Sequence, residues 1–403
     1  MRVIETDVVV AGGGPAGMIL ALLLTRHGVR VTVLERGADF EREYRGEVLM
    51  PRFIQMTRQI GLWESLEKSP HLKLQGFELY LRKKHVATIG VSEISPSAPF
   101  ILWMPQTIML NALHTQAAQD PHFSMYFNAH VDDLIEEAGV IGGVKAVIAG
   151  EQTEVRARVT VGADGRTSVV RKKAALEYEY EEHHFDLIWF TIEKPAGYKD
   201  LVRAFISGKH NYLLLPKYPH HIQCGILVRR GEYARYRKEG IESLKKELMD
   251  ASPILRPFAE SLKDFEPFTI LAAQANRLKE WAKDGLVMVG DAAHTCSPAG
   301  AIGVSVAAGT AIVAADVIKE CFTRGDFSKE ALSKVQSLRQ EEVKEIQTIQ
   351  ARAARVVVPD GFWGKILMSV VAVLLARTGF LRRTQTRLMV ASKPLPIRPE
   401  CRL

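Results

Sequence analysis

The sequence predicts an α/β fold with a βαβ unit at the N-terminus, an inserted and mostly antiparallel β-sheet, and helices at the C-terminal end. Three observations support this prediction. The apolar run Val8–Ala11 passes into a glycine-rich turn and then into an apolar helical pattern. A second apolar run, Val29–Leu34, ends at an acidic residue. Between Leu176 and Leu271, the residue pattern is that of antiparallel strands.

The glycine-rich turn after the first strand has the composition of a phosphate-binding loop. Gly12 permits the tight turn, Gly14 lets the backbone approach a pyrophosphate, and Gly17 lets helix and strand pack closely. The helix that follows directs free N–H groups and its dipole toward an anion. Glu35 stands at the end of the second strand, where an acid accepts the ribose hydroxyls of an adenosine. These features predict a bound dinucleotide, and the alternative is a glycine-rich turn in an ordinary α/β unit.

Composition and charge narrow the class of protein. A chain of 403 residues with 47% hydrophobic content has room for two domains or one elaborate one. Its formal charge of +7 is modest and no basic patch is interleaved with aromatic residues, so we expect no nucleic-acid partner. The start of the chain lacks the long apolar region of a signal peptide, which favours a cytoplasmic location. The four cysteines are widely separated, so we expect free thiols and no metal site; they are Cys224, Cys296, Cys321 and Cys401.

The remaining elements follow in chain order. The predicted helices are Pro51–Leu62, Gln106–Ala118, Gly303–Cys321 and Ser328–Val358. The predicted strands are a hairpin between Gly76 and Ile89, pieces between Val131 and Ile148, and then Val159–Gly165, Leu187–Ile192, Tyr212–Pro216 and Ile222–Val228. The hairpin and the last three strands are expected to form one sheet on the substrate side.

A third motif places an acid at the end of a buried strand, just before the helix of small residues. Asp291 is suited to bind a ribityl hydroxyl, and the N–H groups that open the helix are suited to stabilise negative charge on a reduced flavin. Gly300 and Gly303 let the backbone approach the ring. His294 invites a reading as a general base, but a structural, loop-capping histidine is the favoured interpretation.

Three segments of the chain resemble the signature motifs of the group A flavin monooxygenases, the para-hydroxybenzoate hydroxylase family. They are Gly12–Gly17 with Glu35 and Arg36, Val161–Arg171, and Gly290–His294 with Pro298, in the order and at the spacing of that family. The resemblance implies a Rossmann-like FAD-binding domain of the glutathione reductase type. That domain would comprise residues 1–73, 91–175 and 276–325; residues 74–90 and 176–275 would form the substrate domain, and 326–403 a C-terminal helical segment.

The resemblance also implies the residues that bind FAD. They are Gly12, Gly14, Pro15, Ala16 and Gly17 at the pyrophosphate, Glu35 and Arg36 at the adenosine, Arg45 and Gln106 as further contacts, Asp164 and Gly165 in the Asp-Gly motif, Asp291 at the ribityl chain, and Pro298, Gly300, Ala301, Ile302 and Gly303 beside the ring. The Asp-Gly motif also serves nicotinamide use indirectly in this family. Two departures put the seating of the flavin in question, since the family often has glycine where Ala301 stands and asparagine where Ser305 stands.

The activity implied is insertion of one oxygen atom from O2 into an aromatic, quinolone or polyketide-like apolar substrate through a C4a-hydroperoxyflavin. NAD(P)H would be the transient reductant, since no second dinucleotide fingerprint is present. A base that deprotonates the substrate is left open among His184, Tyr212 and His220. The role of the hydroxylation, biosynthetic or antibiotic-inactivating, is also open, as is the oligomeric state.

Three rival functions remain. A flavin halogenase would resemble its family only with a Trp-x-Trp motif, which this sequence lacks. An FAD-dependent reductase of a prenyl or isoprenoid substrate has the same fold, and oxygen uptake with substrate distinguishes it from a monooxygenase. A non-catalytic, FAD-stabilised partner subunit is the third, and failure of NADPH to reduce the flavin would favour it.

The C-terminal segment lies beyond the resemblance. Ile366–Ala376 is apolar except for Ser369, and its 11 residues are too few to span a bilayer. One hypothesis is a helix that lies on a membrane or caps a pocket, with nearby arginines facing anionic lipid; these are Arg377, Arg382, Arg383 and Arg387. The protein would then be cytoplasmic and peripheral to the inner membrane face. The favoured alternative is a helix packed on the FAD-binding domain.

Overall fold

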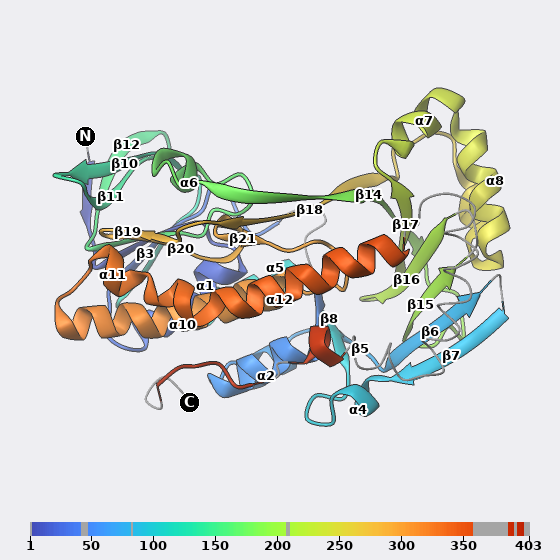
Figure 1. The fold of residues 1–403 in the computed structure, drawn as a ribbon, viewed down its shortest axis with the longest axis horizontal. Coiled ribbons are helices and arrows are strands. Elements are labelled where there is room, and N and C mark those ends of the chain that lie inside the picture. Colours follow the sequence, from blue (N-terminus) through green and yellow to red (C-terminus); the bar gives the residue numbers. More distant parts are fainter. Residues whose placement is uncertain are drawn as a thin grey trace.

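A six-stranded sheet in the order β19-β20-β13-β2-β3-β9 forms the centre of the half that contains the N-terminus (Figure 1). The computed structural model describes residues 2–41, 47–81, 84–206, 210–357, 386–390 and 393–398. The strands are β2 (Val8–Ala11), β3 (Val31–Leu34), β9 (Phe123–Tyr126), β13 (Val159–Gly162), β19 (Ala282–Lys283) and β20 (Leu286–Met288). All but β19 run parallel. Their apolar residues are buried because both faces of the sheet are covered.

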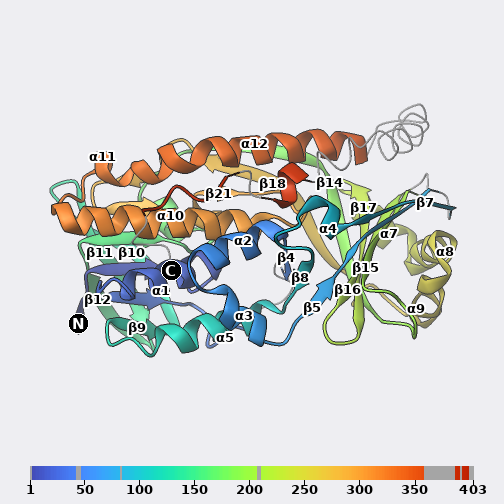
Figure 2. The same cartoon turned by 90° about the horizontal axis from the view of Figure 1, so that it is seen from below.

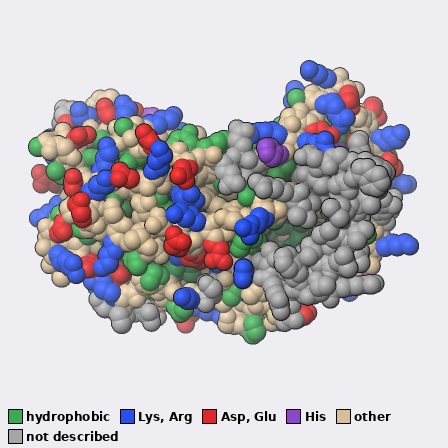
Figure 3. Space-filling model, viewed as in Figure 1, with side chains coloured by type: hydrophobic (Ala, Val, Ile, Leu, Met, Phe, Trp, Pro, Cys, Tyr) green, Lys and Arg blue, Asp and Glu red, His purple; other side chains and the backbone are tan. Residues whose placement is uncertain are grey.

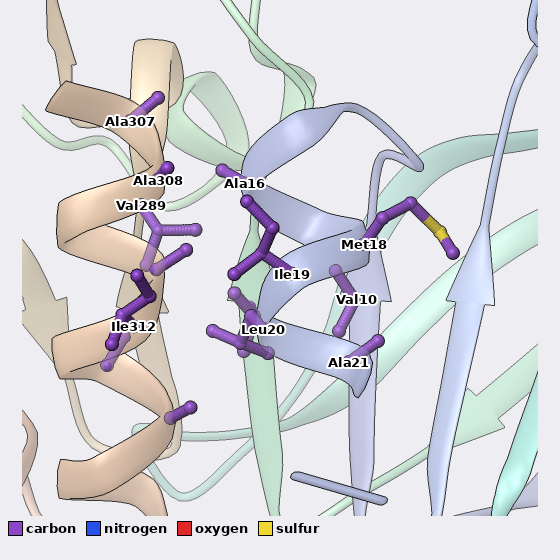
Figure 4. Close-up of a cluster of buried hydrophobic side chains, with 14 of the residues drawn as sticks. Val10, Ala16, Met18, Ile19, Leu20, Ala21, Val289, Ala307, Ala308 and Ile312 are labelled. Atoms are coloured by element: carbon purple, nitrogen blue, oxygen red, sulfur yellow. The ribbon is translucent and has the colours of Figure 1, made fainter. Parts of the chain in front are cut away.

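Two helices begin at the same edge of this sheet and pack against each other. Helix α1 (Pro15–Thr25) follows β2, and helix α10 (Gly303–Arg324) lies beside it. Figure 4 shows Ala16, Ile19 and Leu20 of α1 facing small residues of α10. Ala16, Ala307 and Ala308 are small and lie near the start of each helix, so the two helices pack together there and both N-termini reach the same region.

The second half of the molecule is an eight-stranded sheet in the order β21-β18-β14-β17-β16-β15-β6-β7. Its strands are β6 (Gly76–Leu81), β7 (Lys84–Gly90), β14 (Tyr178–Glu193), β15 (Leu201–Ile206), β16 (Asn211–Lys217), β17 (His221–Arg229), β18 (Thr269–Leu278) and β21 (His294–Thr295). The hairpin and the inserted strands thus share one sheet, as predicted. The long strands β14 and β18 run from this sheet toward the first half (Figure 1).

Three helices between β17 and β18 were not predicted. They are α7 (Glu232–Glu239), α8 (Ile241–Ala251) and α9 (Arg256–Ser261), and they cover one face of the eight-stranded sheet. The expectation of antiparallel strands throughout residues 176–271 was therefore wrong for this stretch. The run is rich in Glu, Lys, Arg and Leu, which favour helix, and its apolar residues pack on the sheet.

The other described elements surround these sheets. They are β1 (Arg2–Glu5), β4 (Val48–Leu49), α2 (Pro51–Gln59), α3 (Trp63–Lys68), β5 (Leu72–Leu74), α4 (Val91–Ile94), β8 (Ile101–Trp103), α5 (Gln106–Ala117), β10 (Ala129–Glu137), β11 (Val140–Ile148), β12 (Glu151–Arg156), α6 (Val169–Lys173), α11 (Lys329–Leu332) and α12 (Lys334–Val357). Helix α12 extends along α10 (Figure 2). The predicted helix of residues 328–358 corresponds to α11 and α12, and the proposed domain boundaries stay predictions.

The molecular surface shown in Figure 3 carries many charged side chains. Acidic and basic side chains are intermingled over the half that contains the six-stranded sheet (Figure 3). Within the described ranges, no helix combines the length and the apolar character needed to cross a bilayer. The apolar run 366–376 lies outside the described residues.

An ion pair bridges the two halves of the molecule. Glu47 precedes β4, and Lys217 ends β16, with 3.9 Å between a carboxylate oxygen and Nζ. Lys217 also lies over the Trp103 ring, with Nζ 5.5 Å from the ring centroid. Burial raises the pKa of Glu47 from 4.5 to about 6, and Lys217 only partly opposes this shift. The carboxylate is thus held at the junction in an environment that penalises its charge.

We predict that Glu47→Gln makes stability less sensitive to pH between pH 4 and pH 7. A raised pKa means that the folded state binds the Glu47 proton more tightly than the unfolded state does. Protonation of Glu47 therefore stabilises the folded state below pH 4.5, and this stabilisation is lost as the pH rises through about 6. Glutamine has no charge to bury, so the variant gains about 2 kcal/mol relative to the native chain over this range. Urea unfolding at several pH values measures the difference, and a pH-independent offset contradicts the prediction.

Candidate active site

The turn between β2 and α1 has a backbone shape that only glycine accommodates. Gly12 has φ +105°, and a Cβ there would lie 2.5 Å from the carbonyl oxygen of Ala163. A Cβ on Gly17 would lie 2.0 Å from the carbonyl oxygen of Gly12. The turn is therefore pressed between the start of α1 and the end of β13, and its outer side is formed by backbone rather than by side chains.

Glu35 supports this turn from the neighbouring strand. One carboxylate oxygen accepts a hydrogen bond from the Gly13 N–H at 2.8 Å, and the other accepts one from the Gly37 N–H at 2.9 Å. The side chain is buried. A carboxylate accepts about four hydrogen bonds, so accepting these two does not exclude other contacts of the Glu35 side chain. Its predicted contact with adenosine is thus compatible with a second role in holding the loop.

The N-termini of α1 and α10 converge beside this turn. Neither helix has a side-chain cap, and Pro15 occupies the first turn of α1. Gly290 lies between them, since a Cβ there would be 2.9 Å from that of Ala16 and 3.5 Å from that of Ala307. The first N–H groups of each helix have no acceptor within the helix. Two such ends at one sheet edge form a favourable environment for an anionic ligand.

Asp164 organises the second motif. Its Oδ2 accepts hydrogen bonds from the N–H groups of Val169, at 2.7 Å, and Val170, at 3.1 Å, at the start of α6. Its Oδ1 is buried and, among the described residues, has no hydrogen-bond partner. Burial raises the pKa of Asp164, although these hydrogen bonds oppose the shift. One oxygen therefore fixes the loop and the other is left for a ligand. Gly165 follows with φ +78° and open space around it.

Two arginines connect the second motif to the third, and the sequence analysis assigned them no role. Arg166 Nε lies 3.2 Å from the carboxylate of Asp291. Arg171 is buried and donates to the carbonyls of Ala292, at 3.1 Å, and Arg166, at 2.6 Å. Asp291 is thus oriented by a cation, while its partly exposed carboxylate stays accessible to a ribityl hydroxyl. The Arg-x4-Arg spacing after Asp-Gly was visible in the sequence, but the partners of these residues were not.

The loop before α10, residues 296–302, lies where the resemblance places the flavin ring, and we call it the flavin loop. The Ala301 N–H donates to the Pro298 carbonyl at 3.1 Å. Gly300 has φ +83° and Ala301 has φ +49°, both in the left-handed region. Glycine adopts this region without strain, which gives a physical reason for the glycine often found in the family at the position of Ala301.

Two buried glutamines of helix α12 hold the flavin loop and the strand β21 that precedes it. Gln350 donates to the carbonyls of Ser297, at 2.8 Å, and Ala299, at 2.6 Å, and accepts from the Ser297 N–H at 3.2 Å. Gln347 donates to the Thr295 and Asn276 carbonyls, each at 3.0 Å. Neither residue was predicted from the sequence to support the site. Their spacing of three residues, which puts two amides on one face of the helix, was the available signal.

The other predicted contacts have varied environments. Arg36 is exposed after β3, Gln106 is the first residue of α5, Ile302 is buried, and Gly303 opens α10 with free space around it. Arg45 lies outside the described residues. Ser305 is buried, and its hydroxyl has no partner in the described part of the chain. The structure thus brings together the turn, the Asp-Gly loop, Asp291 and the flavin loop, while their contacts with FAD stay predictions.

The candidate bases do not converge on this site. Tyr212 packs into the core under α7–α9, where burial raises its pKa, and His184 and His220 are exposed on the eight-stranded sheet. His294 is fully buried beside Trp281, with Nε2 2.8 Å from the Thr310 hydroxyl. Burial lowers the pKa of His294 to about 3, so it is neutral at ordinary pH. The favoured structural interpretation of His294 agrees with this environment.

The described part of the chain contains buried free cysteines and no cluster of metal ligands. Cys224, Cys296 and Cys321 are free and buried, and Cys401 lies outside the described residues. Burial raises the pKa of Cys296 to about 12, which keeps it a neutral thiol. Among the described residues, no group of three His, Cys, Asp or Glu side chains is arranged to hold a metal ion.

The residues present fit FAD. The glycine turn leaves no room for a Cβ on its inner side, two helix N-termini point at one region, and a buried Asp164 oxygen lacks a partner in the described chain. The first two features suit a pyrophosphate, and the third suits a hydroxyl or N–H donor of the ligand. The turn and Glu35 would hold the ADP half, and Asp291 and the flavin loop would hold the riboflavin half.

Comparison with known proteins gives a consistent result. The model of the family described as FAD binding domain matches residues 5–348. The chain is 31% identical over 398 residues to 6-methylpretetramide 4-monooxygenase of Streptomyces rimosus, a match that covers 98% of this chain and 95% of that protein. Its fold is similar to p-nitrophenol 4-monooxygenase from Pseudomonas putida, with a TM-score of 0.79, 18% identity, and coverage of 98% and 100%. A probable FAD-dependent monooxygenase from Pseudomonas aeruginosa gives a TM-score of 0.77 at 20% identity, with coverage of 92% and 99%.

We predict that Gly17→Ala weakens FAD binding by at least about tenfold, or about 1.4 kcal/mol. The added methyl would stand 2.0 Å from the Gly12 carbonyl oxygen, so the turn must open. Gly142→Ala is the matched control because a Cβ at this position on β11 would have no atom within 4 Å. Quenching of FAD fluorescence measures both dissociation constants. Equal affinity in the two variants would show that the close approach at Gly17 does not support the cofactor.

Proposed function

Because the chain belongs to the FAD binding domain family, we propose that it is an FAD-dependent monooxygenase that inserts one oxygen atom of O2 into a polycyclic aromatic substrate. NAD(P)H is the proposed reductant. The observation that carries the proposal is the 31% identity, over nearly the whole of both chains, to an enzyme named for monooxygenation of 6-methylpretetramide. The substrate class we favour is therefore an aromatic polyketide.

The chemistry of oxygen activation belongs to the flavin, which accepts hydride from the nicotinamide and reacts with O2 when it is bound. The protein holds and orients it. Glu35 and the glycine turn fix one end, and Arg166 orients Asp291 at the other. The N–H groups at the start of α10 stabilise negative charge on the reduced ring, because they are preorganised and lie in a largely buried environment.

An apolar cluster between the flavin loop and the eight-stranded sheet is suited to an aromatic substrate. It includes the buried Trp103 and Leu215 and the partly buried Trp189, Leu213 and Ala301. Leu213 and Leu215 alternate along β16 with Tyr212 and Leu214, which pack under α7–α9. The face of the sheet directed at the flavin loop is thus apolar. Such a surface excludes water and favours a planar hydrophobic ligand.

The proposal is tested by anaerobic and then aerobic oxidation of NADPH with FAD-loaded protein, against phenols, quinolones and polycyclic polyketides. We expect a polycyclic polyketide to accelerate flavin reduction, and the aerobic product to gain one oxygen atom from 18O2, as mass spectrometry measures. Flavin that a chemical reductant reduces, but NADPH does not with any ligand, would favour the reductase or partner-subunit alternatives.

We also propose a peripheral membrane contact through the basic C-terminal segment. It is supported by the apolar run 366–376 and the arginines that follow it in the sequence. The full-length triple variant Arg377→Gln, Arg382→Gln, Arg383→Gln should lose flotation with anionic liposomes, because each basic residue contributes about 1 kcal/mol near such a surface. Substitution is preferable to truncation, since residues 386–390 and 393–398 pack on the rest of the chain. Equal flotation of variant and native protein contradicts the proposal.

A further inference from the structure

The described residues near the C-terminus lie against the FAD-binding half of the molecule. Residues 386–390 and 393–398, which we call the C-terminal strap, run beside α2 and α10. Met389, Leu395 and Ile397 are buried in the apolar clusters of the rest of the chain. The strap is thus part of the core, a position that no pattern in the sequence indicated.

A buried arginine clamps the first part of the strap. Arg52 of α2 is 3% exposed, and its Nη2 donates to the carbonyl oxygens of Val390, at 3.0 Å, and Arg387, at 3.4 Å. Its Nη1 forms an ion pair with Glu342 of α12 at 2.8 Å. One guanidinium therefore ties together α2, α12 and the strap.

The strap carbonyls compensate for a shortage of negative charge around the buried Arg52. Arg339 is also buried, and it pairs with the same carboxylate of Glu342, so two guanidinium groups share one acid. Burial raises the pKa of Glu342, but the two arginines outweigh burial and lower it, so Glu342 is charged. A buried guanidinium that shares its carboxylate with a second guanidinium requires further hydrogen-bond acceptors. For Arg52, the two carbonyls of the strap supply them.

Two further contacts fix the end of the strap. Gln59 of α2 exchanges a pair of hydrogen bonds with the backbone of Leu395, each 3.1 Å long. Arg398 Nε lies 2.8 Å from the carboxylate of the buried Asp316, and its Nη2 donates to the Asp316 carbonyl at 2.6 Å. Asp316 belongs to α10, the helix that begins at the flavin loop. The strap is therefore anchored to α2 and to α10, the helix that follows the flavin loop.

The strap lies beside the flavin loop. Gly300 has no side chain, and a Cβ added there would lie 3.6 Å from Leu388 Cδ1, so Leu388 is close to the loop backbone. Met389 and Val390 share an apolar cluster with Ala301. Gly300 and Ala301 both have left-handed backbone, so this part of the loop depends on its neighbours to retain its shape. Gln350 supports the loop at Ser297 and Ala299, and the strap lies next to the two residues that follow.

We propose that the C-terminal strap is a positioning element for the flavin, in which Arg52 holds Leu388 and Met389 against Gly300 and Ala301 of the flavin loop. Arg52 and Leu388 are then positioning residues that act through the loop. This inference rests on the proposed flavin-dependent function. It concerns only how the cofactor is seated, so FAD binding tests it without substrate or NADPH.

The test compares two variants that disrupt the strap contacts, one in α2 and one in the strap, with matched controls. Arg52→Met removes the clamp and leaves Glu342 paired with Arg339, and Leu388→Ala removes the contact with the loop. Arg387→Ala is the control on the strap because its side chain is exposed. Leu332→Ala is the control for global destabilisation, since this buried leucine lies in α11.

The readouts are the FAD dissociation constant from fluorescence quenching and the visible absorption spectrum of the bound flavin. We expect Arg52→Met and Leu388→Ala to weaken FAD binding by about tenfold and to change the shape of the visible bands, with Arg52→Lys intermediate and Arg387→Ala unchanged. The proposal is overturned if Arg52→Met and Leu388→Ala both bind FAD within twofold of the native affinity and give the native absorption spectrum. An equal loss in Leu332→Ala also overturns it, because the effect would then be one of overall stability. If substrate is not oxygenated while these shifts are seen, the proposed function fails and the positioning role stands.

Discussion

The close approach of backbones at one edge of the six-stranded sheet is the constraint on which the site depends. Side-chain atoms are excluded at Gly17 by the Gly12 carbonyl and at Gly290 by Ala16. Small residues along the seam, Ala16 and Ala307 among them, keep α1 and α10 together (Figure 4). Because both helices begin at this edge, their unsatisfied N–H groups converge on one region. A larger side chain on the seam would push the N-termini of α1 and α10 apart, and with them the two ends of the proposed dinucleotide site.

The parts predicted well from the sequence are those whose signal is local. Two local features of the β2–α1 turn require glycine: the φ of +105° at Gly12, and the Gly12 carbonyl that lies against Gly17 five residues later. The hairpin and the inserted strands follow from alternation, a period that each strand shows by itself. The helices α7–α9 were missed although their composition favours helix, because the strand pattern around them was extended across them.

The supports of the site could not be predicted, because their partners are remote in the sequence. Gln350 holds a loop 53 residues away, and Arg52 contacts a carbonyl 338 residues away. A glutamine or arginine in a helical pattern ordinarily indicates an exposed position. Only the folded chain shows that these side chains are buried and donate hydrogen bonds to backbone carbonyls. Tyr212 illustrates the same limit, since which face of β16 meets the flavin loop depends on how the sheet packs.

The two ends of the proposed cofactor site are therefore built in different ways. The pyrophosphate end consists of backbone N–H groups and glycine turns, and the side chain that supports it, Glu35, comes from the end of the neighbouring strand. The flavin loop has left-handed residues and is held by side chains from α12 and the strap. Substitutions in these supports shift the loop without disturbing the phosphate end.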